Sequence, residues 1–349
     1  MKILCFGDIH FHHTHRFSHI TSEGFTIREL EHLECADTII KICEEENIND
    51  IVFLGDLYGP VGDNLSTQTQ TAVCEFVYKI SQVKHLNMLV GNHDLSGTTN
   101  YKDVHKLIPF KYFENVNVYS KPFEMDNFIY MPYCTSDEYA TTFLENIKDK
   151  QNKVVFSHLE LKGINLGNGI ETTHGVPLSL LSQFKMVIQG HYHSSNGYGP
   201  NIKVTGSTQR LSFKDPGKAR NNIIIYDTET NKIERRSFNC PDWLVFNDDN
   251  IDQILDTDLN NYVKVEVSSD ILLTDDIKAR LDLFKGKDIH IDLTRLSFDK
   301  HSSADITQDN TSEDEVSIIK QFIDKTDNDA IQKDLLLKEG IRLLDKVRN

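Results

Sequence analysis

The stretch MVIQGHYH at residues 186–193 is an apolar run that ends at Gly190 and is followed by two histidines. Four other short apolar runs end in the same way, on aspartate, asparagine or histidine: KILCFGDIH at 2–10, DIVFLGD at 50–56, LNMLVGNHD at 86–94 and KVVFSH at 153–158. Short apolar runs bounded by turn residues predict buried strands. In open α/β sheets, sites form outside the carboxyl ends of the strands. We therefore expect five strands to bring polar side chains to one edge.

These strand ends carry carboxylate, amide and imidazole groups. They are Asp8, His10, Asp56, Asn92, His93, His158, His191 and His193. A single Asp or His after a strand is more often a cap or a surface group than a metal ligand, but five strand ends with the same residue types make coincidence a poor explanation. Oxygen and nitrogen donors without cysteine favour Mn²⁺, Fe or Zn²⁺ over a thiolate zinc centre. The sequence therefore predicts a site for two divalent cations.

Glycines stand next to these residues, at positions 7, 55, 91 and 190. Two ligands one residue apart reach the same metal only where the backbone turns sharply, which glycine allows. The glycines also fit ordinary tight turns between strand and loop, so the sequence leaves both interpretations open.

Composition narrows the class of protein. With 349 residues, 39% hydrophobic and 26% charged, the chain is long enough for one large domain and a smaller addition. No apolar run approaches the roughly 20 residues that span a bilayer, and no secretory signal is recognisable. The six cysteines form no CxxC pair, which favours reduced core thiols and a cytoplasmic setting, or host cytoplasm for a viral protein. The net charge of −16 argues against a free-standing nucleic-acid binder.

Strand and helix patterns alternate through the first half of the chain, which predicts parallel strands with right-handed crossovers. We expect helices at 28–47, 68–84 and 136–149, and strands at 112–119, 127–131, 202–206, 222–227 and 232–238. The last three strands suggest a second, more antiparallel sheet, with a hairpin loop at 227–231. On the helix at 28–47, Leu33, Ala36, Ile40 and Cys43 fall at helical spacing.

The last third of the chain has a different pattern. Residues 261–294 read as strand, helix (near 274–285) and strand, which is enough for a small α+β unit. A polar stretch at 300–313 predicts a linker, and two helices follow, the first with Ser312 and Glu315 as a capping box. We expect domains at 1–240, 241–300 and 301–349. The terminal helices serve either domain packing or partner docking.

The sequence resembles the calcineurin-like metallophosphoesterases. Their pattern stands here as GDIH at 7–10, GD at 55–56, GNHD at 91–94, His158, and GHYH at 190–193. The resemblance covers roughly the first 240 residues. It implies an α/β fold with four αββα layers, two sheets face to face and helices outside.

The resemblance also implies roles for the site residues. Asp8, His10, Asp56 and His193 would hold one metal; Asp56, Asn92, His158 and His191 would hold the other, with Asp56 bridging. His93 would be catalytic, as a transition-state stabiliser or as proton donor to the leaving oxygen. Two cations would make a water acidic enough to attack the phosphorus.

Within that superfamily the chain is most similar to the SbcD-type nuclease subunits, including those of bacteriophage recombination endonucleases. This implies a Mn²⁺-dependent DNA exonuclease or endonuclease of recombination, repair or replication, with Mg²⁺, Fe or Zn²⁺ as other metals. It also implies a capping domain, C-terminal helices that dock on an SbcC-type SMC-like ATPase, and a homodimer without membrane contact. The helices near 68–84 and 100–113 would form the dimer surface, with Phe76, Val77 and Ile80 as contacts or as core residues.

Two departures from the nuclease pattern stand out. The nucleases usually carry an Asp three residues after the bridging Asp, to support the catalytic histidine, whereas this chain has Gly59. Asp94 or Asp63 would then be the partner of His93. The loop after His10 carries extra histidines at 12, 13 and 15, which we interpret as solvated rather than as ligands. His174 lines the cleft or is structural.

Two other functions fit less well. A free-standing phosphodiesterase or phosphatase needs no capping domain, so residues 241–349 count against it. A binding module with a decayed site would usually lack a ligand, and the set here is complete.

Overall fold

The computed structural model describes residues 1–12, 20–59, 65–95, 104–164, 171–195, 197–213, 222–238, 240–267, 273–284 and 337–338. The chain divides into two compact units, Met1–Leu296 and Ser297–Asn349. The expected linker and terminal helices lie outside the described residues, apart from the helical pair 337–338. Across the described ranges, we find no helix with the length and apolarity that a membrane crossing requires.

The first sheet has six strands in the order β14-β13-β1-β2-β3-β4. Its parallel part consists of β1 (Lys2–Phe6), β2 (Asp50–Phe53), β3 (His85–Leu89) and β4 (Val116–Tyr119). The hairpin β13 (Ile223–Asp227) and β14 (Lys232–Arg236) extends the sheet antiparallel to β1. The hairpin was predicted correctly, but the expectation that it belongs to a separate antiparallel sheet is wrong. Because β13 reads IIIYD and is buried on both faces, it needs a place inside a two-sided sheet.

The second sheet also has six strands, in the order β11-β12-β10-β7-β6-β5. Its parallel strands are β12 (Ile202–Val204), β10 (Met186–Gln189), β7 (Val154–Ser157) and β6 (Phe128–Met131). The short strands β11 (Gly197–Tyr198) and β5 (Phe123–Met125) pair antiparallel at its two edges. The strand predicted at 202–206 is therefore a parallel member of this sheet.

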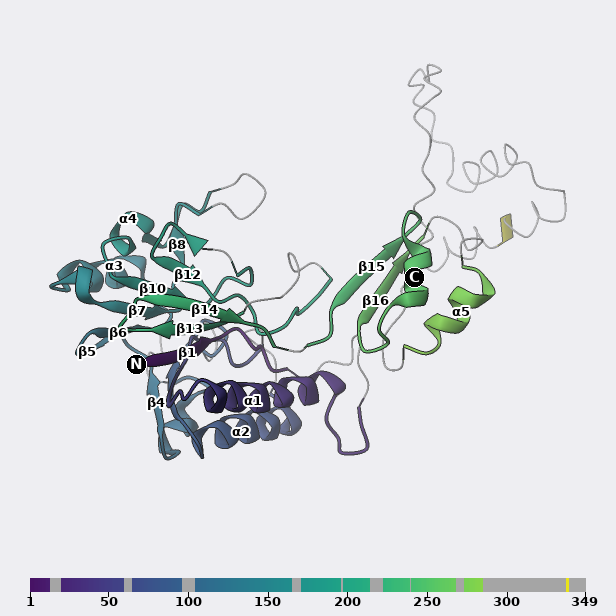
Figure 1. Ribbon diagram of the computed structural model, residues 1–349, viewed down its shortest axis with the longest axis horizontal. Coiled ribbons are helices and arrows are strands. Elements are labelled where there is room, and N and C mark those ends of the chain that lie inside the picture. The colour runs from purple at the N-terminus through teal and green to yellow at the C-terminus, as the bar shows by residue number, and fades with distance from the viewer. Residues whose placement is uncertain are drawn as a thin grey trace, which may run out of the picture. The chain divides into compact units, whose positions relative to one another are not determined.

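The two sheets pack face to face, and helices cover their outer faces (Figure 1). Alternation along β1 shows how the layers form, because Ile3 and Cys5 enter the core between the sheets while Leu4 and Phe6 enter the core under the helices. The core between the sheets is completed by residues of β2, β7 and β10 such as Val52, Phe156 and Ile188. The predicted four-layer αββα sandwich is confirmed.

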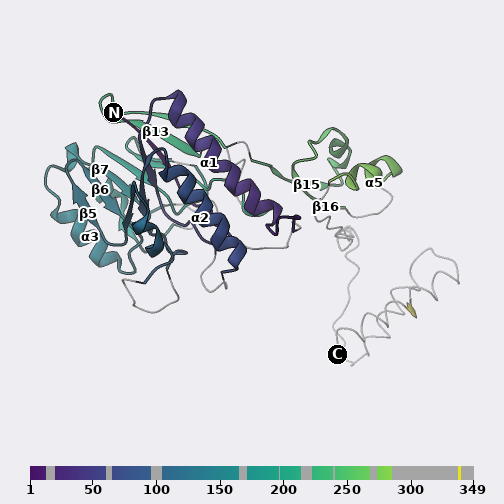
Figure 2. The ribbon, with the colours of Figure 1, turned by 90° about the horizontal axis from the view of Figure 1, so that it is seen from below.

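Helices α1 (Ile27–Glu45) and α2 (Thr67–Ser81) lie side by side on the first sheet (Figure 2). Thr26 and Glu29 form a capping box that starts α1. The buried face of α1 is centred on Ala36, Ile39 and Cys43, whereas Leu33 and Ile40 of the expected stripe are half-buried. On the second sheet lie α3 (Asp137–Asn146) and the single turn α4 (Leu178–Leu181).

The expected dimer contacts of α2 are core residues. Phe76, Val77 and Ile80 are at most 1% exposed and pack against the first sheet. A second expected helix, near 100–113, is in its described part the 3₁₀ helix η1 (Ile108–Tyr112), which has a proline in its first turn. The remaining short elements are η2 (Lys150–Asn152) and the two-residue pair β8 (Leu161–Lys162) and β9 (Val176–Pro177).

Residues 243–267 and 273–284 build a small unit with its own core, here called the β15–β16 unit. It contains the parallel strands β15 (Trp243–Asn247) and β16 (Tyr262–Glu266), the 3₁₀ helix η3 (Ile251–Asp256) and α5 (Asp275–Leu281). β16 and α5 were predicted, β15 was not, and the strand expected at the end of 261–294 lies outside the described residues.

The β15–β16 unit contacts α1 through aromatic and charged side chains. Trp243 stacks on Tyr262 at 4.5 Å between ring centroids, and the Arg28 guanidinium lies 5.0 Å from the centre of the Trp243 ring. The Tyr262 hydroxyl donates a hydrogen bond to Glu31 at 2.8 Å. These contacts join the unit to the helix that follows the first strand.

Candidate metal centre

The carboxyl ends of five parallel strands meet at one edge of the sandwich. β1 leads to Asp8 and His10, β2 to Asp56, β3 to Asn92 and His93, β7 to His158, and β10 to His191 and His193. Four of these residues have left-handed backbone conformations: Asp8 (φ 54°), His10 (φ 57°), Asp56 (φ 58°) and His191 (φ 70°). This conformation is uncommon for residues other than glycine. It turns the chain so sharply that residues two apart point to the same place.

Buried hydrogen bonds hold these turns. The backbone N–H of Asp8 donates to Gly55 at 2.9 Å, and that of His10 to Asp56 at 3.1 Å. The Thr208 hydroxyl donates to the carbonyl of Gly7 at 2.8 Å, and the Thr208 N–H to that of Asp8 at 3.3 Å. The turn after β1 is therefore fixed from both sides by hydrogen bonds to its main chain.

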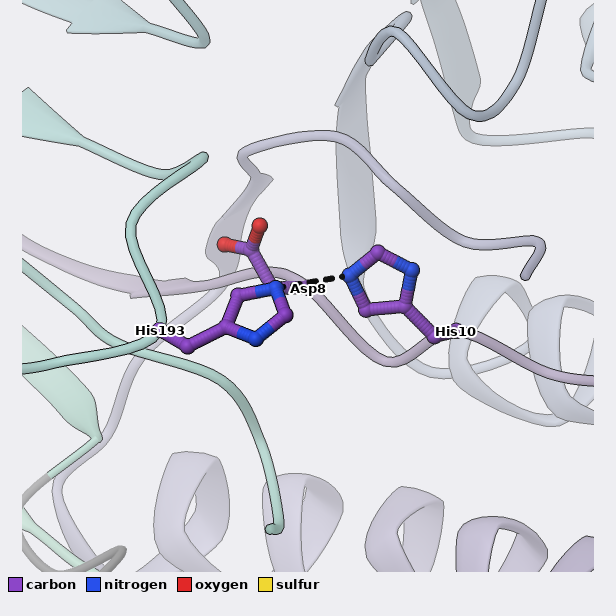
Figure 3. Close-up of side chains that lie close together, drawn as sticks. All are labelled: Asp8, His10 and His193. Atoms are coloured by element: carbon purple, nitrogen blue, oxygen red, sulfur yellow. Dashed lines mark hydrogen bonds between the residues drawn. The ribbon is translucent and has the colours of Figure 1, made fainter. Parts of the chain in front are cut away.

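Asp8, His10 and His193 converge in what we call the Asp8 cluster (Figure 3). The Nε2 atoms of His10 and His193 lie 3.1 Å apart. Asp8 is fully buried, and its Oδ1 atom has no hydrogen-bond partner among the described residues. A buried carboxylate oxygen without a partner is costly unless a cation pairs with it.

Asp56, His158 and His191 form a second group, the His158 cluster, and Asn92 adds an oxygen to it. Asn92 Oδ1 lies 3.0 Å from both His158 Nε2 and His191 Nδ1. His158 Nδ1 lies 2.6 Å from the carbonyl oxygen of Leu54, so Nδ1 carries the proton and the lone pair of Nε2 faces the cluster. Such orientation by a backbone carbonyl is typical of metal-binding histidines.

Asp56 links the two clusters. Its Oδ2 atom lies 3.3 Å from His158 Nε2 and 3.8 Å from His10 Nε2. All seven residues predicted as ligands are thus brought together. A donor set of imidazole nitrogens and carboxylate or amide oxygens fits two divalent cations of the Mn²⁺, Fe or Zn²⁺ type.

Comparison with known proteins agrees with this geometry. Residues 1–195, more than half of the chain, match the family model described as calcineurin-like phosphoesterase. The chain belongs to this family. It is also 27% identical over 243 residues to exonuclease subunit 1 of Enterobacteria phage T4, and this match covers 67% of each protein. This phosphoesterase is therefore a hydrolase of phosphoester bonds, and its family uses divalent metals.

Burial is the largest influence on the pKa values of the candidate metal ligands. It lowers the pKa of His10 and of His191 to about 3, so both rings are neutral and able to bind a metal. Burial, together with the Asp56 carboxylate, raises the pKa of Asp8 to about 7. Burial would also lower the pKa of His158, but the neighbouring Asp56 outweighs it and raises that pKa to about 9. A cation would displace protons from Asp8 and His158.

At two positions only glycine fits, because atoms of the candidate ligands lie where a Cβ atom would be. A Cβ atom at Gly91 would lie 2.1 Å from Asp56 Oδ1, and one at Gly55 (φ +103°) would lie 2.5 Å from His158 Nδ1. The sequence left open whether the glycines serve the site or ordinary turns. At these two positions the space around the candidate ligands excludes a side chain.

Asp94 organises the turns instead of supporting His93. Its buried carboxylate accepts hydrogen bonds from the backbone N–H groups of Gly91, Asp56, Leu57 and Tyr58, at 2.9 to 3.1 Å. These bonds tie the turn after β2 to the turn after β3. The sequence predicted Asp94 only as a partner of His93, although its place in GNHD was a signal for a role in the site. The contact of Thr208 with the site was not predicted, because its partners lie about two hundred positions away in the chain.

His93 stands beside both clusters. Its backbone N–H donates to Asp56 Oδ1 at 2.9 Å, and its ring meets the ring of His10 edge to face, with 4.9 Å between centroids. The other proposed partner, Asp63, lies outside the described residues. A Cβ atom at Gly59 would lie 2.8 Å from the Cβ atom of His12, so a side chain at position 59 would displace His12.

The additional histidines do not enter the clusters where they are described. His12 Nδ1 lies 3.3 Å from the carbonyl oxygen of His10, on the main-chain side of that residue. His174 is exposed to solvent. His13 and His15 lie outside the described residues.

Proposed function

We propose that this phosphoesterase is a Mn²⁺-dependent DNA exonuclease or endonuclease subunit. The observation that carries the proposal is the position of Asp56 between two clusters of candidate metal ligands, with His93 next to both. The relative in phage T4, named as an exonuclease subunit, supports DNA as the substrate.

In this proposal Asp8, His10, Asp56 and His193 hold one cation, and Asp56, Asn92, His158 and His191 hold the other. Two such cations would polarise the phosphoryl oxygens and lower the pKa of a water. The protein orients the ligands: Leu54 fixes the tautomer of His158, and the turn after β1 presents Asp8 and His10 together. Asp8, His10, Asp56 and His158 are buried, which strengthens the electrostatic interactions among them.

His93 acts on the phosphate. Burial lowers the pKa of His93, and its ring lies edge-on to His10, at the border of the Asp8 cluster. From there the imidazole donates a hydrogen bond to a phosphoryl oxygen or a proton to the leaving oxygen. Its function needs a fixed position, because small displacements of such groups strongly reduce rates.

The similarity to the phage T4 exonuclease subunit and the net charge of this chain both support a partner protein. A protein named as a subunit works within an assembly, which supports an SbcC-type SMC-like ATPase as partner of this chain. A chain of net charge −16 gains affinity for DNA from such a partner. A homodimer and a role in DNA recombination or repair, within a cytoplasm, complete the proposal. The dimer contacts lie elsewhere than Phe76, Val77 and Ile80, which are buried.

The test is degradation of end-labelled duplex DNA with Mn²⁺, beside a His93→Ala control that keeps its metals. We expect Mn²⁺-dependent degradation by the wild type, and a rate of degradation lower by at least about a hundredfold in the control. Turnover of a small aryl phosphodiester without any action on DNA, with or without the ATPase, would favour a free-standing phosphodiesterase. Absence of both activities in metal-loaded protein would contradict the proposal.

A further inference from the structure

The position of His93 requires a physical explanation, because no carboxylate of the described residues forms a hydrogen bond with its Nδ1 atom. The Nδ1 atom of His93 is buried and has no hydrogen-bond partner among the described residues. The Asp94 carboxylate is already engaged with four backbone N–H groups. The described hydrogen bonds that fix His93 therefore act on its main chain.

One of these bonds comes from a lysine. The Lys106 ammonium donates to the backbone carbonyl of His93 at 3.1 Å. Its charge makes this bond stronger than one between two neutral groups. The other main-chain bond of His93 goes from its N–H to Asp56. The peptide units on both sides of His93 are thus held by charged side chains.

Lys106 is itself held in place. Its backbone N–H donates to the carbonyl of Asp94 at 2.8 Å, next to the bridge between Leu95 and His105. Its half-buried ammonium also lies 5.6 Å from the centre of the Tyr58 ring, in the turn after β2. Lys106 therefore connects the turn that carries Asp56 with the turn that carries His93.

We propose that Lys106 is a positioning residue that acts through His93, holding the imidazole in place from its main-chain carbonyl. This inference rests on the proposed role of His93 in phosphodiester hydrolysis. A surface lysine with only a packing role would affect stability but would have no specific coupling to His93.

A double-mutant cycle tests the coupling. We would measure kcat and KM for a small aryl phosphodiester with Mn²⁺ in the wild type, Lys106→Met, His93→Ala and the double variant. Lys106→Met should lower kcat about tenfold with little change in KM. In the His93→Ala background the same change should have no further effect. Mn²⁺ affinity, measured by calorimetry, should be the same in the wild type and Lys106→Met.

Two variants serve as controls. Lys106→Arg keeps the charge and should recover most of kcat. Lys111→Met removes the charge of a nearby exposed lysine that lies over the Tyr112 ring, and it should leave kcat unchanged. Equal losses from Lys106→Met with and without His93 would overturn the proposal, because Lys106 would then act on substrate or fold directly.

A second measurement does not depend on activity. Long-range ¹H–¹⁵N spectra of the metal-free protein report the His93 ring, whose signals are assigned by their loss in His93→Ala. We expect these signals to shift or broaden in Lys106→Met and to remain as in the wild type in Lys106→Arg. If the wild type hydrolyses no phosphodiester, the proposed function fails, and the spectra alone decide: unchanged His93 signals in Lys106→Met overturn the role of Lys106, and changed signals support it.

Discussion

The Asp8 cluster and the His158 cluster are held in different ways. Both clusters contain left-handed residues, but the turn that carries Asp8 and His10 also receives hydrogen bonds from Thr208. The His158 cluster depends on side chains packed at close range, with His158 held between Leu54 and Asn92 and a glycine against its ring. The first should therefore be sensitive to the loss of a distant hydrogen bond, and the second to the addition of a single atom.

The largest effect is expected where the clusters share a residue. Asp56→Asn removes the charge that lies between both, so both cations should bind weakly. We expect phosphodiesterase activity to fall by at least about a thousandfold. Calorimetric titration with Mn²⁺ checks the cause, and tight binding of two ions by the variant would show that Asp56 is not shared.

A change confined to the His158 cluster should come next. In Gly55→Ala the new methyl group would collide with His158 Nδ1, so one of two Mn²⁺ ions should be lost and activity should fall about a hundredfold. Gly24→Ala is the matched control, since Gly24 also has a positive φ (+86°) but no atom within 4 Å of the added Cβ atom. Equal effects of the two variants would mean that backbone strain, and not the collision, is responsible.

A substitution that affects only the Asp8 cluster should have a smaller effect on metal binding. Thr208→Val removes a buried hydrogen bond to Gly7 and should lower the free energy of unfolding by about 1–2 kcal/mol. We expect Mn²⁺ affinity to decrease at one site only. Thr208→Ser keeps the hydroxyl and should bind both ions as the wild type does. Equal weakening of both Mn²⁺ sites would contradict the separation of the clusters.

The smallest effect concerns the metal-free protein at different pH. Because Asp56 raises the pKa of His158 from 6.5 to about 9, against the effect of burial, His158 stabilises the fold below pH 6.5, and this contribution is lost as the pH rises through 9. The melting temperature in EDTA should therefore be several degrees lower at pH 9.5 than at pH 6.5. His158→Gln should reduce this difference, and a wild-type melting temperature that rises with pH would contradict it.

The residues of the candidate metal centre could be predicted from the sequence, because a pattern of a few neighbouring residues marks each of them. A short apolar run followed by Gly-Asp or Gly-His marks a strand and its polar end within a few residues, as at Asp8, Asp56 and His191. The four-layer sandwich was predicted from the resemblance to the metallophosphoesterases. The roles of the candidate ligands as metal ligands stay predictions until a metal is measured.

Features that depend on pairing over long distances could not be predicted. The sequence cannot tell which sheet receives β13, because its run of isoleucines is equally apolar on both faces. Thr208 and Lys106 contact the site only after the chain has folded, and the sequence does not show these contacts. On α1, propensity and spacing predicted a helix, but the neighbouring sheet selects which of its apolar stripes is buried.

The contact between α1 and the β15–β16 unit can be followed by intrinsic tryptophan fluorescence. Trp243 is the only tryptophan in the chain, so intrinsic indole fluorescence comes from this contact alone. The indole is 2% exposed, with Tyr262 against its face and the Arg28 guanidinium near it. Separation of the unit from α1 would bring the indole into water and shift its emission to longer wavelengths. Fluorescence emission can therefore report detachment of this unit independently of the chemistry at the candidate metal centre.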